Sequence, residues 1–249
     1  MRYSLRWYLL TLLCWPVLLW QGKRVRKLAL RLPEANGKRY GEHGMGKPLR
    51  LLICGDSAAA GVGIADQQDA LSGHLINQLS GAHQLQWQLH AKTGFSSKEL
   101  VNMLQALPAQ KFDVVVVSIG VNDVTALRSA QAYRIQIQQL MSCIHSKFAD
   151  PFAEPIVLFS AIPDMQQFIA LPSPLNHWLG IKAAELNQVL HSELVNWPKA
   201  IIVNAEMPLT EDMFAADGFH PSALGCAIWA QKLSEAFQLN KSLCISGTL

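Results

Sequence analysis

Hydrophobic positions recur along this chain with two different periods. Short runs of consecutive apolar residues, or apolar residues at every second position, indicate strands, whereas apolar residues at every third or fourth position indicate helices. The strand pattern occurs at Leu49–Cys54, Gln84–Ala91, Phe112–Ile119, Pro155–Ile162 and Ala200–Val203. The helix pattern occurs between and after these strands, at Gln67–Ser80, Ser96–Leu107, Val124–Phe148, Leu179–Val195 and Pro221–Leu239.

Alternating strands and helices predict an α/β fold. Most of the strands are continuous apolar runs, which is typical of a parallel sheet whose two faces are both covered by helices. In such sheets the carboxyl ends of the strands meet at one edge, and active sites form there. Catalytic side chains are therefore expected in the segments that directly follow the predicted strands.

The first part of the chain has a different pattern. The apolar run from Trp7 to Trp20 is shorter than the roughly 17–25 residues of a membrane-spanning helix, and it is similar in length to the core of a signal sequence. No small-residue cleavage site follows it. We predict that residues 1–32 are a hydrophobic signal or anchor segment, with an uncleaved membrane anchor preferred. A cleaved signal, which implies export, and an interfacial helix are the alternatives.

Charge separates the N-terminal part from the rest of the chain. Residues 1–50 hold 11 Lys or Arg and 2 Asp or Glu, whereas the remainder holds 10 and 16. A nucleic-acid-binding domain needs basic residues on its folded body, so no nucleic-acid role is predicted. The basic flank after the apolar run is compatible with anionic lipid or with an ordinary charged surface, and weakly favours a body on the cytoplasmic side.

Two boundaries follow from composition. Residues 33–48 are rich in Gly, with two Pro and mixed charges, which predicts a linker. Residues 49–249 are then the folded domain. The five cysteines have no CxxC spacing, so neither a disulfide framework nor a zinc site is indicated.

The tripeptide Gly55-Asp56-Ser57 follows the first predicted strand. A serine hydroxyl becomes a nucleophile when a neighbouring base removes its proton. Ser57 would end a strand and open a helix, where its backbone N–H can point into a cleft. The alternative is a serine that only caps a helix.

A candidate base lies near the other end of the chain, in Asp217-Gly218-Phe219-His220-Pro221. Asp217 and His220 are three residues apart, so both can reach the same side of a tight turn. Asp217 would orient the imidazole through Nδ1 and leave Nε2 for the serine. The alternative is an aspartate that caps the next helix.

Ester hydrolysis also needs donors for a negatively charged oxygen. Asn122, in Gly120-Val121-Asn122-Asp123, has a side-chain amide after the third predicted strand. Gly94 follows the second strand and permits close approach of its backbone N–H. Each of them alone is equally compatible with a turn or a cap.

Together, the four blocks resemble the GDSL/SGNH hydrolases in order and approximate spacing, over about residues 50–238. The resemblance implies a three-layer α/β/α, flavodoxin-like fold with a five-stranded parallel sheet. It implies Ser57 as nucleophile, Asp217 and His220 as its partners, and Ser57, Gly94 and Asn122 as the oxyanion hole. It implies no metal and no cofactor.

The expected substrate is a small-molecule ester or thioester, with a lipid-like or aryl group. The apolar loop after the fourth strand contains Phe168 and Trp178, which we predict to line a substrate pocket. A carbohydrate O-acetyl esterase or an acyltransferase would use the same triad. An alternative of another class is a non-catalytic, membrane-tethered binding module that keeps the fold.

Overall fold

A six-stranded sheet forms the centre of the protein. The computed structural model describes residues 5–150, 153–204 and 210–246. The strands have the order β1-β3-β2-β4-β5-β6, and β2 to β6 are parallel, whereas β1 is antiparallel to β3. Their bounds are β1 Tyr40–His43, β2 Lys47–Gly55, β3 His83–Ala91, β4 Val114–Ser118, β5 Ile156–Ser160 and β6 Ala200–Val203.

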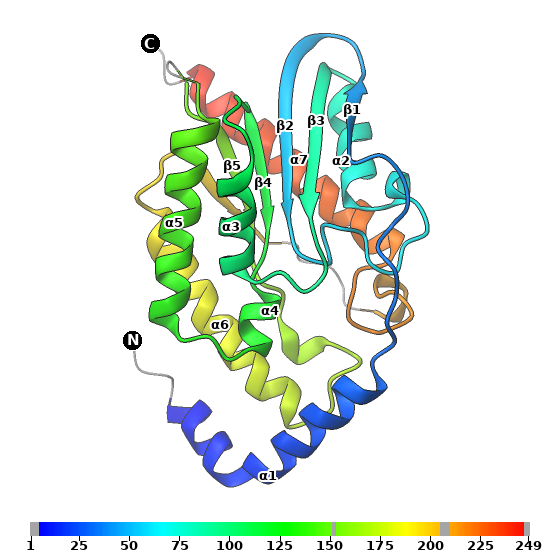
Figure 1. Ribbon diagram of the computed structural model, residues 1–249, viewed down its shortest axis with the longest axis vertical. Helices are drawn as coiled ribbons and strands as arrows, with labels where there is room; N and C mark the ends of the chain where they lie inside the picture. The colour runs from blue at the N-terminus through cyan, green and yellow to red at the C-terminus, as the bar shows by residue number, and fades with distance from the viewer. Residues whose placement is uncertain (1–4, 151–152, 205–209, 247–249) are drawn as a thin grey trace.

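Helices cover the sheet on both faces, so the predicted α/β class and layering are confirmed (Figure 1). The helices are α1 Leu5–Leu28, α2 Leu71–Ser80, α3 Ser97–Ala106, α4 Val121–Thr125, α5 Ala130–Phe148, α6 Leu175–Leu194 and α7 Ala223–Ser246. Alternate residues of the central strands point to opposite faces: Leu52 and Val115 pack under α3, α5 and α6, whereas Ile53 and Val116 pack under α2 and α7.

The prediction of five strands is corrected to six. The additional strand, β1, lies within residues 33–48, which the composition predicted to be a linker. Its four residues are mostly exposed and contain no apolar run, and β1 is held at the sheet edge by backbone pairing with β3. A hydrophobic pattern does not reveal such a strand because β1 is held by backbone pairing and polar contacts and buries no apolar side chain.

The predicted single helix over Val124–Phe148 is two helices. The chain breaks between α4 and α5 at Leu127, which has a positive φ of 53°. The hydroxyl of Ser129 then accepts a hydrogen bond from the Ala132 N–H and starts α5. The break lets α4 remain at the carboxyl end of β4 while α5 runs back along the sheet.

Helix α1 lies at the lower end of the molecule in Figure 1, beyond the carboxyl ends of the parallel strands. It is bent, and Pro16 lies inside it, where the missing N–H interrupts helical hydrogen bonding. Within the described part of the chain, no helix has both the length and the apolar character needed to cross a membrane. The anchor, cleaved-signal and interfacial interpretations of residues 1–32 stay predictions.

Candidate active site

Ser57 lies directly beyond the carboxyl end of β2. At Gly55, the last residue of β2, an added Cβ would lie 2.1 Å from the carbonyl oxygen of Ser118, so only glycine lets β2 and β4 approach this closely. The segment after Ser57 forms consecutive turns, with hydrogen bonds from Ala60 N to Asp56 O and from Val62 N to Ser57 O. The expected helix at this point is therefore replaced by a tight coil that projects Ser57 from the sheet edge.

The structure brings Ser57, His220 and Asp217 into one hydrogen-bonded chain. His220 Nε2 is 2.8 Å from Ser57 Oγ, and His220 Nδ1 is 2.6 Å from Asp217 Oδ2. The Asp217 side chain is 3% exposed and that of His220 is 23% exposed. The imidazole thus reaches the serine hydroxyl on one side while the carboxylate on its other side is shielded from water.

The turn that carries Asp217 and His220 fixes their relative position. Asp217 Oδ1 accepts the backbone N–H groups of Phe219 (2.9 Å) and His220 (3.0 Å), and Gly218 takes a positive φ of 68°. Burial alone would raise the pKa of Asp217, but hydrogen bonds from the His220 ring and from the two backbone N–H groups together lower it. Asp217 is therefore an ionised carboxylate at neutral pH.

Asn122 lies in the first turn of α4 and lines the same cavity as Ser57, whereas Gly94 lies in the turn after β3 and is not among the residues that line this cavity. Gly94 has a positive φ of 83°, and no hydrogen bond of its N–H to another backbone group is present in the described residues. Asn122 Nδ2 donates to the carbonyl oxygen of Phe95 at 2.9 Å. This bond uses one amide hydrogen and fixes the side chain, which leaves the second hydrogen for another acceptor.

The loop that carries Gly94 is fastened by a carboxylate that the sequence patterns did not single out. Glu34 Oε1 accepts hydrogen bonds from both the backbone N–H and the hydroxyl of Thr93, each at 2.7 Å. Its other oxygen is 2.6 Å from the Arg39 guanidinium, which also donates to the carbonyl of Ala91 at 2.7 Å. The segment predicted as a linker thus clamps the residues on both sides of Lys92.

A fully buried carboxylate fastens the start of α4, the helix that carries Asn122. Asp123 is fully buried and accepts hydrogen bonds from Ser97 N and Ser97 Oγ, both at 2.8 Å. Arg128 lies 2.7 Å from the same carboxylate. Burial raises the pKa of Asp123 despite these partners. The start of α3 and the start of α4 are therefore joined beneath Gly94 and Asn122.

A cavity of about 740 Å³ opens beside the serine. Ser57, Asn122 and His220 lie in its wall, together with Phe168 and the apolar residues Ile119, Val121, Ile162, Met213, Phe214 and Phe219. Phe168 makes edge-to-face contacts with Phe214 and Phe219, at centroid distances of 5.7 and 6.2 Å. Two of these three aromatic residues, Phe214 and Phe219, were not anticipated.

The expectation for Trp178 is corrected, because Trp178 is absent from the residues that line this cavity. Its ring is stacked on Trp7 of α1 at 5.2 Å, and its Nε1–H donates to Thr11 Oγ1 at 2.8 Å. Helical geometry explains the difference: Gly180, Ala183, Ala184 and Asn187 of α6 face the cavity, whereas Trp178 lies on the side of α6 that contacts α1. Among the described residues, no three His, Cys, Asp or Glu side chains cluster as metal ligands would.

The chain is similar to known proteins in sequence and in fold. The chain is similar to the GDSL-like esterase Rv1075c of Mycobacterium tuberculosis, with 26% identity over 74% of this chain, and the match spans 60% of that relative's length. It is also similar to the solved structure of a lipolytic G-D-S-L family protein from Veillonella parvula (14% identity, TM-score 0.57, 76% of this chain and 98% of that one). A carbohydrate acetylesterase family member from Sinorhizobium meliloti has the same fold (15% identity, TM-score 0.55, 77% and 98%).

The family model of the GDSL-like lipase/acylhydrolases matches residues 53–228, from the interior of β2 to α7. This range includes Ser57, Gly94, Asn122, Asp217 and His220. The matched part is most of the chain, and the solved structures share its sheet and helical layers. The chain therefore belongs to the GDSL-like lipase/acylhydrolase family.

Proposed function

We propose that the protein is a serine hydrolase that cleaves carboxylic esters through an acyl-enzyme on Ser57. The observation that carries this proposal is the hydrogen-bonded chain from Ser57 Oγ through His220 to the shielded Asp217 carboxylate. A serine that merely capped a turn would not need an imidazole 2.8 Å away. The membership of the chain in a family described as lipases and acylhydrolases supports the same reaction.

In the first half of the reaction, Ser57 Oγ attacks the carbonyl carbon of the ester and its proton passes to His220 Nε2. The carbonyl oxygen becomes an oxyanion that accepts hydrogen bonds from the backbone N–H groups of Ser57 and Gly94 and from the Asn122 amide. Asp217 stabilises the imidazolium through Nδ1. The carbon–oxygen bond then breaks, and His220 returns the proton to the departing alkoxide.

In the second half, a water molecule attacks the acyl-enzyme while His220 removes its proton. Collapse of the second tetrahedral intermediate breaks the bond to Ser57 Oγ, which takes the proton back from His220. The products are the carboxylic acid and free enzyme. A thioester would follow the same steps with a thiolate as the leaving group.

The lining of the cavity favours an apolar acyl or aryl group. Phe168, Phe214 and Phe219 form an aromatic wall, and the cavity volume of about 740 Å³ is within the usual range for small-molecule sites. Hydrolysis of carbohydrate O-acetyl esters and transfer of an acyl group to an acceptor would use the same triad. Both reactions are therefore tested separately.

The test is hydrolysis of p-nitrophenyl esters from acetate to palmitate by the full chain, with acetylated sugars as the second substrate series. Ser57→Ala must lose at least about 10⁴-fold in kcat. Phe168→Ala is expected to change the preference for acyl length and leave acetate turnover within about threefold. No hydrolysis of any ester by the wild-type chain would contradict the proposal and favour a binding module.

A further inference from the structure

Helix α1 is apolar on two opposite sides. We use the name inner seam for its residues that face the body, which are Trp7, Thr11, Cys14, Leu18, Gln21 and Val25. We use the name outer stripe for six exposed apolar residues between and beside them, which are Leu5, Leu9, Leu12, Leu13, Leu19 and Trp20. Successive residues of the inner seam are three or four positions apart, so they share one side of the helix. In the outer stripe, Leu19 and Trp20 follow Leu12 and Leu13 by seven residues, about two turns, so this set lies on the opposite side.

The inner seam fixes α1 to the body of the protein. Trp7 stacks on Trp178, and Thr11 accepts the hydrogen bond from the Trp178 ring. Further along the helix, Gln21 is 7% exposed; its amide donates to the carbonyl of Ser173 at 2.8 Å and accepts the N–H of Leu175 at 3.2 Å. These contacts flank the bend at Pro16, so both arms of α1 are held in place.

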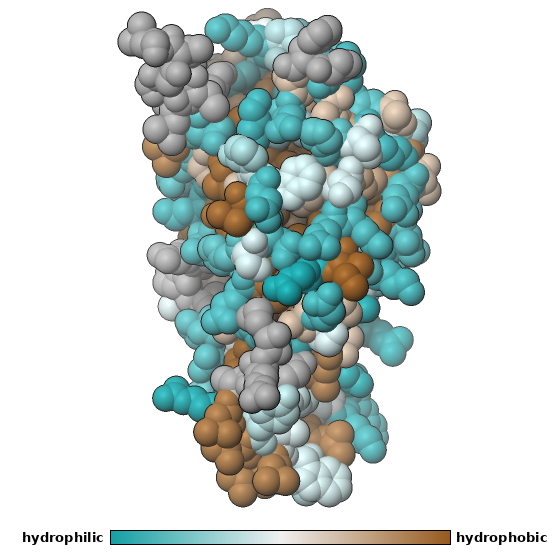
Figure 2. Space-filling model, turned by 90° about the vertical axis from the view of Figure 1, so that its left-hand side faces the viewer, coloured by the Kyte–Doolittle hydropathy of each residue, from teal (hydrophilic) through white to brown (hydrophobic). Residues whose placement is uncertain are grey.

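The outer stripe faces solvent although it is apolar. Leu12 and Leu13 are 74% and 76% exposed, and Trp20 is 58% exposed. A helix that packs one face on a globular body normally presents polar residues on the other face. Figure 2 shows the apolar side chains gathered at the lower end of the molecule, where α1 lies. A contiguous exposed patch of this kind marks an interaction surface.

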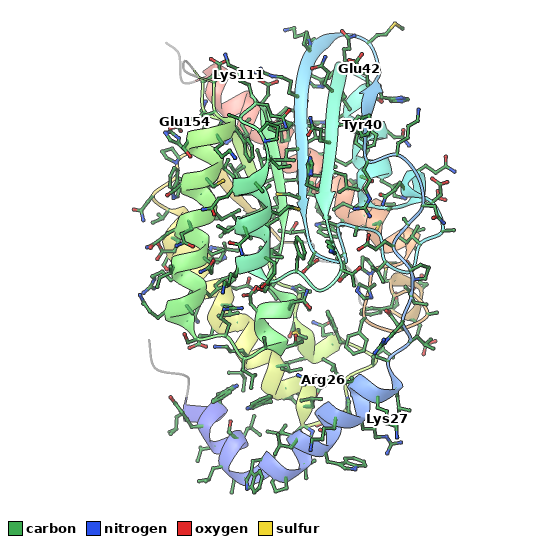
Figure 3. All side chains as sticks on the ribbon, in the orientation of Figure 1. Arg26, Lys27, Tyr40, Glu42, Lys111 and Glu154 are labelled. Atoms are coloured by element: carbon green, nitrogen blue, oxygen red, sulfur yellow. The ribbon has the colours of Figure 1, made fainter. Side chains whose placement is uncertain are left out.

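The charges on α1 indicate what this surface contacts. Residues Leu5–Leu28 carry five Lys or Arg and no acidic residue. Arg6 lies at one end of the outer stripe, and Lys23, Arg24, Arg26 and Lys27 lie at the other; Figure 3 labels Arg26 and Lys27 there. The Arg24 guanidinium also sits 5.2 Å from the ring centroid of Trp20.

We propose that the outer stripe of α1 inserts into the surface of a bilayer that contains anionic lipids, with the helix lying in the membrane plane. Leucine side chains would enter the acyl boundary, and the basic ends would contact lipid phosphates. Trp20 would lie at the headgroup level together with Trp15, which lies outside the stripe and is 56% exposed. A second copy of the chain fits less well, because it would bring a helix of the same positive charge against this one.

Membrane binding in this orientation would place the catalytic cavity beside the lipid. A groove of about 460 Å³ runs between α1, at Trp20 and Leu28, and the turn that carries Asp217 and Phe219. Phe219 also lines the catalytic cavity, so a single aromatic side chain lies in the wall of both. In addition, Arg26 donates to the carbonyl of the cavity residue Thr125 at 3.5 Å. The proposal concerns where the protein binds and does not depend on its hydrolytic activity.

The experiment is co-sedimentation of the full chain with vesicles of phosphatidylcholine, with and without phosphatidylglycerol. We expect binding to the anionic vesicles, weakened severalfold when NaCl rises from about 0.1 to about 0.5 M. The variant Leu9→Gln/Leu12→Gln/Leu13→Gln should bind at least about tenfold more weakly. The matched control Ile135→Gln/Val195→Gln/Leu239→Gln, with three exposed apolar residues on other helices or their ends, should bind like the wild type.

The charge contribution is tested in the same assay. Lys23→Gln/Arg24→Gln/Lys27→Gln should remove the preference for phosphatidylglycerol, whereas the exposed control Lys38→Gln/Lys47→Gln/Lys98→Gln should keep it. Brominated lipids should quench wild-type tryptophan fluorescence, and Trp15→Phe/Trp20→Phe should lose most of this quenching. The control Trp87→Phe/Trp197→Phe should retain it.

Several outcomes would overturn the proposal. Equal binding by the outer-stripe variant and the wild type would show that another surface contacts lipid. Absence of vesicle binding, with a wild-type dimer that the outer-stripe variant converts to a monomer, would show that a second copy covers α1. A circular dichroism spectrum and Tm close to those of the wild type are required of every variant, and the tryptophan variants give an answer without altering the leucines.

Discussion

The two halves of the candidate active site are built in different ways. Asp217 and His220 are held within a four-residue turn, where the Asp217 carboxylate accepts hydrogen bonds from the His220 ring and from two backbone N–H groups of that same turn. Gly94, in the turn after β3, and Asn122, in the first turn of α4, instead depend on carboxylate contacts between segments that are far apart in the chain. Glu34 lies 59 residues before Thr93, and Asp123 lies 26 residues after its partner Ser97.

The triad turn is thus held by contacts within four consecutive residues, whereas the oxyanion side is held by contacts between distant segments. The turn needs only the sequence from Asp217 to His220, and the long-range step is the approach of His220 to Ser57. The oxyanion side depends on the segment from Glu34 to Arg39, which precedes β1, and on the junction of α3 with α4. Substitutions in the turn should therefore impair proton transfer. Substitutions in the contacts between distant segments should loosen the position of the oxyanion donors and lower kcat by a smaller factor.

The largest effect on this comparison is expected for Asp217→Asn. The backbone N–H groups of Phe219 and His220 would hold the amide oxygen where Asp217 Oδ1 now lies, so the amide NH₂ would face His220 Nδ1. An NH₂ group can only donate, so the imidazole would carry its proton on Nε2 and could not accept the serine proton. We expect kcat for p-nitrophenyl acetate to fall about 10³–10⁴-fold with little change in KM. Asp164→Asn is the matched control, since Asp164 also lies in the cavity wall and caps a short helical turn. A loss below about tenfold for Asp217→Asn would contradict the assignment.

The next largest effect is expected for Asn122→Ala. Removing the amide removes one donor to the oxyanion but leaves the triad intact, so kcat should fall about 10²–10³-fold. Because the ground-state carbonyl needs this donor less than the transition state does, KM should change little. Asn196→Ala, at an exposed position after α6, should behave as the wild type. A rise in KM with unchanged kcat would mean that Asn122 binds substrate only.

A smaller effect is expected for Glu34→Gln. The glutamine weakens the charge-assisted hydrogen bonds to Thr93 and Arg39, which loosens the loop of Gly94, and kcat should fall about three- to tenfold. Glu42→Gln, on β1, is the control, because within the described residues the Glu42 side chain accepts a hydrogen bond from the exposed Gln86 and from no other group. A purely structural role would lower Tm without lowering kcat at a temperature where the variant is folded.

The stability that Glu34 contributes through its contacts with Thr93 and Arg39 should depend on pH in one direction. Burial would raise the pKa of Glu34, but hydrogen bonds from Thr93 together with Arg39 lower it from 4.5. The stability that it contributes is therefore fully present above about pH 4.5 and is lost as the pH falls through the lower folded-state pKa. The Tm difference between wild type and Glu34→Gln should shrink below that pH, and an increase there would contradict the clamp.

The smallest effect is expected for Asp56→Asn, and it concerns stability. Burial, with the neighbouring Asp123, raises the pKa of Asp56 from 3.8 to about 7. Between these values the folded state holds a proton that the unfolded state has lost, so this group reduces stability as the pH rises. Asparagine does not ionise, so the variant should gain roughly 3 °C or more in Tm relative to wild type at about pH 8 compared with about pH 5. An equal difference at both pH values would contradict the raised pKa.

Much of the fold could be predicted because the buried strands carry their own pattern. The run Val114 to Val117 is apolar on both faces and became the fully buried strand β4. Strand β1 could not be predicted in this way, because it is held by backbone pairing and by a polar side-chain contact, with no buried apolar side chain. The break between α4 and α5 was missed for a related reason: the apolar spacing continues across Leu127, and only the cap at Ser129 indicates a new helix.

The candidate site also has residues that the sequence pattern indicates and residues that it does not. The positions of Ser57, Asn122 and Gly94 after strands, and the spacing of Asp217 and His220, could be read from the chain. The roles of Glu34 and Asp123 could not, because their partners are far away in sequence and become neighbours only in the folded sheet. For Trp178 the sequence pattern indicated a role that the structure does not give it. Its apolar character suggested a pocket, whereas its ring packs on Trp7 of α1, a helix within the segment that the sequence analysis treated as separate from the domain.

The most direct test of the central claim is labelling of the full chain with a fluorophosphonate, followed by mass spectrometry of its peptides. Only a serine activated by a base reacts rapidly with this probe. We predict a single adduct on Ser57, its absence in Ser57→Ala, and labelling slowed by at least about 10³-fold in Asp217→Asn. No adduct on the folded wild-type chain, or an adduct that persists in Ser57→Ala, would contradict the assignment of Ser57 as the nucleophile.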